Sequence, residues 1–364
     1  MKKRVLHIMN YAAIYRGNFI ESLERLDSIG KTENFYLFTN EARESGAMSW
    51  IEPMSSNGKK VWFLSEKAHA DASLIRKIIK ENDIAAVHTH FITRKQFENV
   101  WLGTRFTGVP VIMHFHNHSV YTRNPVKKWL RRMLYRKCIM IACSESVFES
   151  VKKDYPRNEK YYVNNGVNFD RLEECKELSN SDFGVQEDEK PLLVFGFDYY
   201  RKGVDLAVKA VEDLRKEGKK YALLISLSRN FEVVEKNICE ALGEVPDWVR
   251  IVKARNDVAS LYNYVDLFLS PSREEGLPYS VVEAAYAKCN VVMSDISAQK
   301  NLKVPYGVWC KAEDSKSLAE AIEQAESVRE EKRMHITEVQ EEMRKNYSVD
   351  TWAQNIEELY DRII

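Results

Sequence analysis

Two glutamates, Glu275 and Glu283, stand eight residues apart in the segment 270–285, which reads SPSREEGLPYSVVEAA. We expect this segment to run from a strand through a loop into a helix, whose first backbone N–H groups and dipole favour a negatively charged ligand. Gly276 lets the backbone approach that ligand closely, and Pro278 stiffens the loop. A carboxylate accepts hydrogen bonds from neighbouring hydroxyls, so the spacing suits two sugar rings held on either side of a diphosphate.

The same residues have a plainer interpretation, which the sequence leaves open. Ser280-Val-Val-Glu283 is also a capping box, in which Glu283 would only satisfy the start of its own helix. Glu275 follows Glu274, and the two could be a solvated pair in a loop.

Several other chemistries lack their motifs. No G-x-G-x-x-G follows an expected strand and no G-x-x-x-x-G-K-[ST] occurs, which disfavours nicotinamide, flavin and P-loop enzymes. No D-x-D pair is present to hold a divalent metal against a diphosphate, so we expect no metal and no cofactor beyond the substrates. Five histidines gather in one half of the chain without carboxylates or cysteines at ligand spacing, so most are expected to be structural or to contact an acceptor; they are His88, His90, His114, His116 and His118.

The elements that would position these groups alternate as in a parallel α/β sheet. Short apolar runs predict strands at 4–9, 34–38, 60–64, 84–88, 109–114 and 138–143, and again at 192–195, 221–227, 251–252, 267–270 and 290–293. Helical spacing predicts helices between them, at 18–26, 72–80, 97–106, 204–214, 280–287, 315–329, 330–345 and 351–364.

The alternation of predicted strands and helices is interrupted by a polar stretch near 170–190, which predicts a linker between two domains. We therefore expect a first Rossmann-like domain over 1–178, a second over 188–345 and a last helix over 346–364. With 364 residues, 45% of them hydrophobic and 30% charged, the chain is long enough for two cores. It lacks a membrane-spanning run, and its six cysteines form no C-x-x-C pair, so a cytoplasmic location is expected.

Charge is divided unevenly along the chain. Residues 1–178 hold 29 Lys and Arg against 20 Asp and Glu, a net of +9, and the remainder carries −9. Much of the positive charge lies in 124–137, where Val126, Trp129, Leu130, Met133 and Leu134 form an apolar stripe between lysines and arginines. The ordinary expectation is a helix with its apolar side on the sheet and its basic side in water. The alternative is that this helix docks peripherally on the anionic inner face of the cell membrane. No nucleic-acid partner is expected.

The segment E-G-L-P-Y-S-V-V-E-A-A resembles the E-x7-E signature of the family 4, or group 1, glycosyltransferases. These are retaining enzymes with the GT-B fold, in which two Rossmann-like domains face each other across a cleft and a C-terminal helix crosses back to the first domain. Further motifs follow the family's order: Gly17-Asn18 in the first loop, Ala142-Cys143-Ser144-Glu145, Asn165-Gly166-Val167, Phe195-Gly196, Lys202-Gly203, and a last helix with Trp352.

The resemblance implies a role for each matched residue. Glu275 would contact the hydroxyls of the transferred sugar, Glu283 would hold the ribose, and Lys202 would neutralise the departing diphosphate. His116 would be the family's cleft histidine, and it counts with Glu275 and Lys202 as catalytic. Donor contacts are expected from Gly17, Asn18, Arg201, Lys202, Glu275, Gly276, Leu277, Pro278, Tyr279, Ser280 and Glu283.

The sequence also departs from the family pattern. Phe197 stands where the family usually has an arginine for the diphosphate, and Arg201, beside Lys202, is expected to replace that cation. Cys289 and Val291 replace the family's Gly and Pro after the signature helix.

The resemblance thus implies a metal-independent hexosyltransferase that moves a sugar, UDP-linked, to the hydroxyl of a glycan or lipid-linked acceptor in polysaccharide or surface-glycan biosynthesis. Two alternatives remain open. One is a nucleotide-sugar epimerase of the same architecture, and the other is a non-catalytic sugar-nucleotide-binding partner of another transferase.

Overall fold

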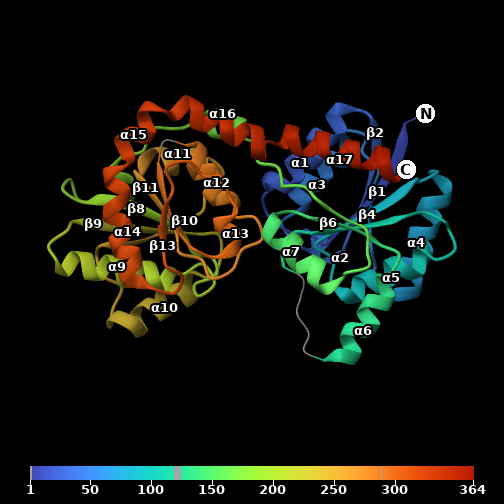
Figure 1. The fold of residues 1–364 in the computed structure, drawn as a ribbon, viewed down its shortest axis with the longest axis horizontal. Helices are drawn as coiled ribbons and strands as arrows, with labels where there is room; N and C mark the ends of the chain where they lie inside the picture. The colour runs from blue at the N-terminus through green and yellow to red at the C-terminus, as the bar shows by residue number, and fades with distance from the viewer. Residues whose placement is uncertain (1, 119–123, 288) are drawn as a thin grey trace. The chain divides into compact units, whose positions relative to one another are not determined.

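The computed structural model describes residues 2–118, 124–287 and 289–364. The chain divides into two compact units. One comprises the chain up to Gly166 together with Val349–Ile364, and the other is Val167–Ser348 (Figure 1).

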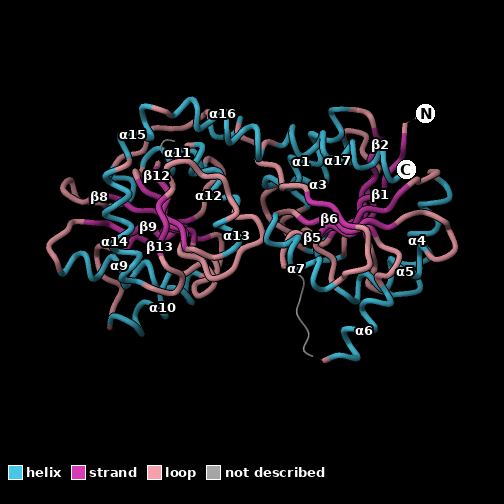
Figure 2. The backbone as a smooth tube through the Cα atoms, in the orientation of Figure 1, coloured by secondary structure: helices cyan, strands magenta, loops and turns pink. Residues whose placement is uncertain are grey.

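In the described part of the first unit, seven parallel strands form one sheet in the order β3-β2-β1-β4-β5-β6-β7 (Figure 2). The strands are β1 (Lys3–Met9), β2 (Thr32–Phe38), β3 (Val61–Phe63), β4 (Ala86–His90), β5 (Val111–Phe115), β6 (Ile139–Ala142) and β7 (Lys160–Tyr162). The register pairs His7 with His88 and His90 with His114. Because neighbouring residues in register lie on the same face of a sheet, these imidazoles come together in its middle.

The helices of this unit are α1 (Gly17–Ile29), α2 (Asn40–Glu44), α3 (Met48–Ser56), α4 (Ala68–Glu81), α5 (Arg94–Thr104), α6 (Pro125–Leu134), α7 (Glu145–Asp154) and α17 (Val349–Ile363). The apolar sides of α1 and α17 share a core with the sheet, through Phe19, Leu23, Trp352 and Tyr360. Glu357 of α17 also accepts hydrogen bonds from the amide (3.1 Å) and the hydroxyl (2.9 Å) of Thr32 at the start of β2. The predicted return of a late helix to the first domain is confirmed.

The second unit holds a parallel sheet whose described strands run β10-β9-β8-β11-β12-β13. They are β8 (Lys190–Phe195), β9 (Tyr221–Leu227), β10 (Val249–Lys253), β11 (Leu267–Ser270), β12 (Asn290–Ser294) and β13 (Val308–Cys310). Its helices are the 3-10 turn η1 (Asp170–Leu172), α8 (Asn180–Phe183), α9 (Val204–Lys216), α10 (Phe231–Leu242), α11 (Val258–Tyr264), α12 (Tyr279–Tyr286), α13 (Ser297–Lys300), α14 (Ser315–Ser327), α15 (Arg329–Met334) and α16 (Ile336–Tyr347). The predicted α/β class, with two parallel sheets, is confirmed.

The segment after Gly166 lies with the second unit, whereas the sequence suggested a first domain that continues to residue 178. The amide of Val167 donates to the carbonyl of Tyr347 at 2.6 Å, and Val167 forms a parallel bridge with Ser348. Phe169 stacks on Tyr286 of α12 with ring centroids 4.4 Å apart. Apolar burial against α12 and α16 therefore decides where this segment belongs.

Across the described residues, no helix combines the length and the apolar character that crossing a bilayer requires.

Candidate active site

The start of α12 and the loop before α9 interlock in the second unit. The amide of Arg273 donates to the carbonyl of Arg201 at 2.8 Å, and the Arg273 guanidinium makes a two-pronged ion pair with Asp205 at 2.7 and 2.8 Å. Gly203 has φ +68°, and a Cβ there would lie 2.0 Å from the carbonyl oxygen of Pro271. The glycine of the Lys202-Gly203 pair is thus required by the contact between the two loops.

This contact brings Lys202 and Glu275 together. The Lys202 ammonium lies 2.6 Å from Oε1 of Glu275, with the two side chains 13% and 8% exposed. The hydroxyl of Ser272 donates to the same oxygen at 2.9 Å, and a guanidinium nitrogen of Arg201 lies 3.5 Å from Oε2. Glu275 is therefore a largely buried carboxylate held by two cations, and its interpretation as a solvated loop residue is wrong.

Glu283 is also buried, and it lies one turn after the start of α12, whereas Glu275 lies in the loop before that helix. Its Oε2 accepts from the hydroxyl of Tyr262 at 3.2 Å, and Oε1 lies 4.0 Å from a guanidinium nitrogen of Arg171. The helix begins at Tyr279 after Pro278, and within the described residues no side chain caps it. The capping-box interpretation of Ser280 and Glu283 is therefore wrong, because Ser280 already lies inside the helix.

Nine of the residues predicted to hold the donor lie in two segments of this unit: Arg201 and Lys202 precede α9, Glu275, Gly276, Leu277 and Pro278 belong to the loop after β11, and Tyr279, Ser280 and Glu283 lie in α12. The first peptide units of an eight-residue helix thus lie beside a lysine, an arginine and two carboxylates. This combination suits a ligand with both anionic and hydroxyl groups.

Phe197, at the position of the missing arginine, is surrounded by cations. Arg201 and Lys202 lie 5.4 Å from the centre of its ring, and Arg229 lies 5.3 Å from it. Arg229 follows β9, so a different strand supplies a cation to the same place. Arg229 was not among the residues expected from the sequence, where its only signal is an arginine just after a buried strand.

In the first unit, Gly17 and Asn18 lie at the start of α1, and His116 follows β5. Phe19 links the start of α1 to His116, because it follows Asn18 in α1 and its ring centre lies 5.1 Å from that of His116. Phe91 stacks on His116 itself, with ring centroids 4.1 Å apart. The structure thus brings the predicted first-unit residues to one region at the carboxyl ends of β1 and β5.

A cavity of about 500 Å³ opens beside His116. Its lining combines the ends of β4 and β5 with residues of α5 and α6, including Arg94, Lys127 and Arg131. Phe91, Phe115, Tyr135 and Tyr155 add aromatic surface, and none of the described lining residues is an aspartate or a glutamate. Two of these cations already have carboxylate partners, since Arg94 lies 3.1 Å from Glu98 and Arg131 lies 3.7 Å from Asp154. The lining therefore favours a partly apolar ligand whose anionic group would compete with those carboxylates.

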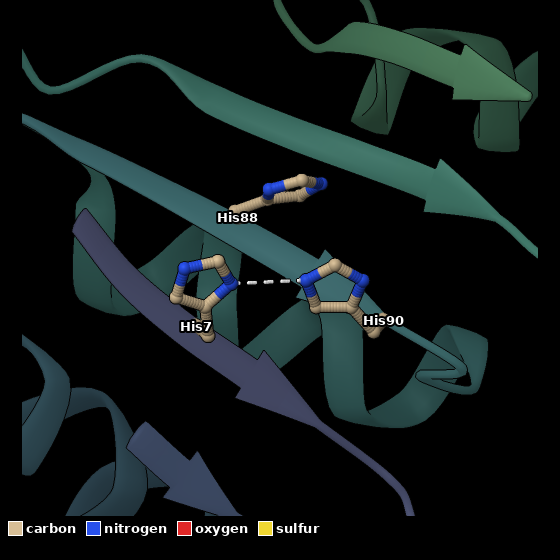
Figure 3. Close-up of side chains that lie close together, drawn as sticks. All are labelled: His7, His88 and His90. Carbon is tan, nitrogen blue, oxygen red and sulfur yellow. Dashed lines mark hydrogen bonds between the residues drawn. The ribbon is translucent and has the colours of Figure 1, made fainter. Parts of the chain in front are cut away.

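The histidines form one buried cluster in this unit. His7, which was not among the residues expected from the sequence, joins His88, His90, His114 and His116, and all five are nearly inaccessible. Figure 3 shows three of them, His7, His88 and His90. Burial lowers the pKa of His7 to about 4 and of His116 to about 3, and it holds the pKa of His88, His90 and His114 well below the usual value. All five rings are therefore neutral at neutral pH, and His118 contacts Ser146 instead, at 3.1 Å.

Helix α6 is oriented opposite to the ordinary expectation. Its apolar stripe is exposed, with Val126, Trp129, Leu130 and Met133 between 44% and 62% accessible. The basic side instead packs on the end of α7, where Lys128 and Arg131 lie 3.4 and 3.7 Å from the carboxylate of Asp154. The buried carboxylate and nearby carbonyls attract this side of the helix, and the expectation that the stripe covers the sheet is wrong.

Comparison with known proteins agrees with these motifs. The family model described as glycosyl transferases group 1 matches residues 176–343, and the model of glycosyltransferase family 4 matches residues 56–171. The chain is 23% identical to the putative glycosyltransferase EpsF of Bacillus subtilis over 85% of this chain and 86% of EpsF. It is 29% identical to a Campylobacter jejuni enzyme, N,N'-diacetylbacillosaminyl-diphospho-undecaprenol alpha-1,3-N-acetylgalactosaminyltransferase, over 52% of this chain and 49% of that one.

Solved structures show the same fold. A Rickettsia africae glycosyltransferase superposes with a TM-score of 0.81 at 16% identity, covering 100% of this chain and 98% of the other. Anabaena HepE, in complex with UDP and glucose, superposes with a TM-score of 0.78 at 15% identity over 99% of this chain and 100% of HepE. Since the two family models match residues in both units, over 56–171 and 176–343, the chain belongs to the family 4, group 1 glycosyltransferases and has their GT-B fold.

Proposed function

We propose that this glycosyltransferase moves a hexose from a UDP-sugar to the hydroxyl of a glycan or lipid-linked acceptor, with retention of the anomeric configuration, in polysaccharide or surface-glycan biosynthesis. The observation that carries the proposal is the Lys202–Glu275 pair at the start of α12. It offers a cation for a leaving diphosphate and a carboxylate for sugar hydroxyls in one place. The UDP bound to the similar HepE supports the choice of base.

The chemistry that such a site must perform is the stabilisation of charge on the leaving diphosphate. A fixed ammonium and the amides at a helix start lower the energy of that charge without reorganising as it develops. In the unliganded protein Glu275 neutralises Lys202, so the donor must insert its phosphate and hydroxyl oxygens between partners that are already paired. Glu283, which accepts a hydrogen bond from Tyr262, would hold the ribose hydroxyls.

The cation-lined cavity of the first unit is proposed as the acceptor site. Arg94, Lys127 and Arg131 favour an acceptor that carries a phosphate near the reacting sugar, and the aromatic lining favours its apolar part. A saccharide linked to a lipid through a diphosphate has both features. The Campylobacter relative is named for an acceptor of this kind, which supports the choice.

The exposed stripe of α6 is proposed to dock on the anionic surface of the membrane that holds such an acceptor. Trp129 and Leu130 would enter the headgroup region, and exposed Lys127, Arg136 and Lys137 would meet the lipid phosphates. Helix α6 also lines the acceptor cavity, so docking would place the cavity next to the lipid that carries the acceptor.

The decisive experiment measures turnover of UDP-sugars with and without a diphosphate-linked lipid saccharide, in the presence of excess EDTA. We expect transfer only with acceptor, unchanged by EDTA, and an α-linked product from an α-linked donor by NMR. Isomerised sugar nucleotide without acceptor would instead identify an epimerase. Donor binding without turnover would identify a binding partner, and recovery of activity only with Mn²⁺ or Mg²⁺ would contradict metal independence.

A further inference from the structure

Three buried histidines form a continuous hydrogen-bonded chain across the first sheet. Nδ1 of His7 lies 3.1 Å from Nε2 of His90, as the dashed line in Figure 3 shows. Nδ1 of His90 lies 3.2 Å from Nε2 of His116. The chain therefore runs from β1 through β4 to His116 after β5, and each link joins the Nδ1 of one ring to the Nε2 of the next.

The far end of the chain is anchored by an amide whose orientation is fixed. Oδ1 of Asn34 lies 3.0 Å from Nε2 of His7, and Nδ2 of Asn34 donates to Asp27 at 2.9 Å. The carboxylate of Asp27 also accepts from the Tyr36 hydroxyl at 2.6 Å and pairs with Lys59 at 2.7 Å. A carboxylate that accepts from three donors cannot donate to Asn34, so Asn34 must turn its N–H₂ to Asp27 and its oxygen to His7.

That orientation sets every proton in the chain. A neutral imidazole carries one N–H and one acceptor nitrogen. His7 must donate from Nε2 to Asn34, so its Nδ1 must accept from His90, and the Nδ1 of His90 must accept from His116 in turn. At the end of the chain, Nδ1 of His116 is buried and makes no hydrogen bond of regular geometry among the described residues, although the side chain of Asn165 lies close enough to raise the pKa of the ring. An unpaired acceptor there costs less than an unpaired N–H.

We propose that Asp27 and Asn34 are positioning residues that fix His116 in its Nε2–H form, so that its Nδ1 is a hydrogen-bond acceptor beside the acceptor cavity. Because Nδ1 is buried, only an acceptor hydroxyl whose binding displaces the groups that cover this nitrogen would donate to it. Only this consequence for the acceptor rests on the proposed function, because the protonation pattern follows from the fold alone.

A bound metal ion is the rival explanation for the cluster. Two groups of three histidines, His7 with His88 and His90, and His90 with His114 and His116, place ligand nitrogens within 4.8 Å of one another. Neither group includes a carboxylate or a cysteine, so a dication would enter a buried site with no anionic ligand. The nitrogens joining His7, His90 and His116 are also already used in the chain.

The test is long-range ¹H–¹⁵N NMR of the full chain with ¹⁵N-labelled histidine, which distinguishes Nδ1–H from Nε2–H rings; single histidine variants would assign the signals. We expect His7, His90 and His116 to be Nε2–H by at least about tenfold, as a net preference of roughly one buried hydrogen bond gives. Asn34→Leu removes the hydrogen-bond acceptor for His7, and Asp27→Asn allows the side-chain amide of Asn34 to rotate and exchange its oxygen and nitrogen. Both should raise the Nδ1–H population of all three rings together.

Matched controls come from the same unit, where Nδ2 of buried Asn99 donates to Asp71 at 3.2 Å and neither residue belongs to the hydrogen-bonded histidine chain. Asn99→Leu and Asp71→Asn should leave the protonation pattern unchanged. The proposal is overturned if wild-type His116 is Nδ1–H, if Asn34→Leu and Asp27→Asn both leave the pattern intact, or if one equivalent of Zn²⁺ binds and displaces the imidazole protons. None of these readouts requires transferase activity, so failure of the proposed function would not affect them.

Discussion

At the scale of single residues, the Lys202–Glu275 pair makes the sharpest prediction. Lys202→Ala and Glu275→Gln should each lower turnover by roughly 10²-fold or more, because each removes a charge fixed in place before the reaction. The chain should remain folded, since Lys202 and Glu275 contact loops and not the sheet core. Steady-state kinetics and thermal melting measure the two effects.

The matched controls are Lys209→Ala and Glu212→Gln, which break an exposed ion pair of 2.8 Å in the same unit. They should leave turnover unchanged. Equal losses in both pairs, or full activity of Lys202→Ala, would contradict a role for the buried pair in catalysis.

Glu283 makes a separate prediction. Glu283→Gln should weaken nucleotide binding by about tenfold, as the loss of a charge-assisted hydrogen bond does, with a smaller effect on turnover at saturation. Calorimetric titration with UDP measures it. If the variant melts earlier but binds UDP as the wild type does, then Glu283 serves only the packing around Tyr262.

The cations around Phe197 can be tested against one another. Arg201→Ala and Arg229→Ala should each weaken UDP binding several-fold, and the double variant should weaken it more. Both guanidinium groups lie at about the same distance from the ring of Phe197, the residue that replaces the family's arginine. Phe197→Arg should be neutral or helpful in the Arg201→Ala background. Arg333→Ala, whose partner is Asp266, is the control. Unchanged affinity in both single variants would remove these arginines from the donor site.

The sequence identified most of these residues because their spacing along the chain carries the signal. Glu275, Lys202 and Glu283 lie in two loop-to-helix segments that could be read directly. Arg229 and His7 were missed because their roles depend on which strands lie side by side. The pairing of β1 with β4 brings His7 close to His90, and the pairing of β8 with β9 brings Arg229 close to Phe197. The spacing of residues along the sequence does not reveal which strands pair.

At the scale of elements, α6 shows where pattern alone is insufficient. The repeat of apolar residues predicts an amphipathic helix but does not say which side meets the protein. Asp154 and the carbonyls at the end of α7 select the basic side, through contacts such as that of Arg132 with the Asp154 carbonyl at 2.7 Å. The three-residue strands β7 and β13 were also missed, although β3, which is equally short, lies within the strand predicted at 60–64.

The exposed stripe predicts binding to anionic vesicles. Trp129→Ala with Leu130→Ala should abolish most co-sedimentation, because these side chains would enter the headgroup region. Replacing Lys127, Arg136 and Lys137 with glutamine should weaken binding by about 10²-fold at low salt, at about 1 kcal/mol per cation. High salt should remove that difference.

Lys128, Arg131 and Arg132 are unsuitable for this test because they hold the helix in place. Trp309→Ala, an exposed tryptophan of the second unit, is the control and should bind vesicles normally. Binding that ignores lipid charge, or that persists without Trp129 and Leu130, would exclude α6 as the docking surface.

At the scale of the whole molecule, the buried histidines predict acid sensitivity. Unfolded histidines gain protons below about pH 6.5 and the buried rings do not, so protonation favours the unfolded state as the pH falls. With a folded pKa of about 4 for His7 and about 3 for His116, each should lower the free energy of unfolding by about 2 kcal/mol between pH 7 and pH 5.

Urea unfolding at the two pH values checks the expectation. His114→Leu should reduce the pH dependence with little cost at pH 7, because both ring nitrogens of His114 lack hydrogen-bond partners among the described residues. His69→Gln and His335→Gln, at exposed positions, should leave it unchanged. Equal stability at pH 7 and pH 5 would mean that the cluster is protonated or hydrated in the folded protein.

The return of α17 to the first unit has a consequence for how the protein is made. A ribosome releases the seven strands of the first sheet well before it reaches residue 349, and the whole second unit is synthesised in between. During that interval the face that awaits Trp352 and Tyr360 is uncovered, and His88 lacks the hydroxyl that lies 2.6 Å from its Nδ1 in the folded protein. We therefore expect the first unit to complete its core only after the second unit has been translated, and to expose apolar surface that favours aggregation until then.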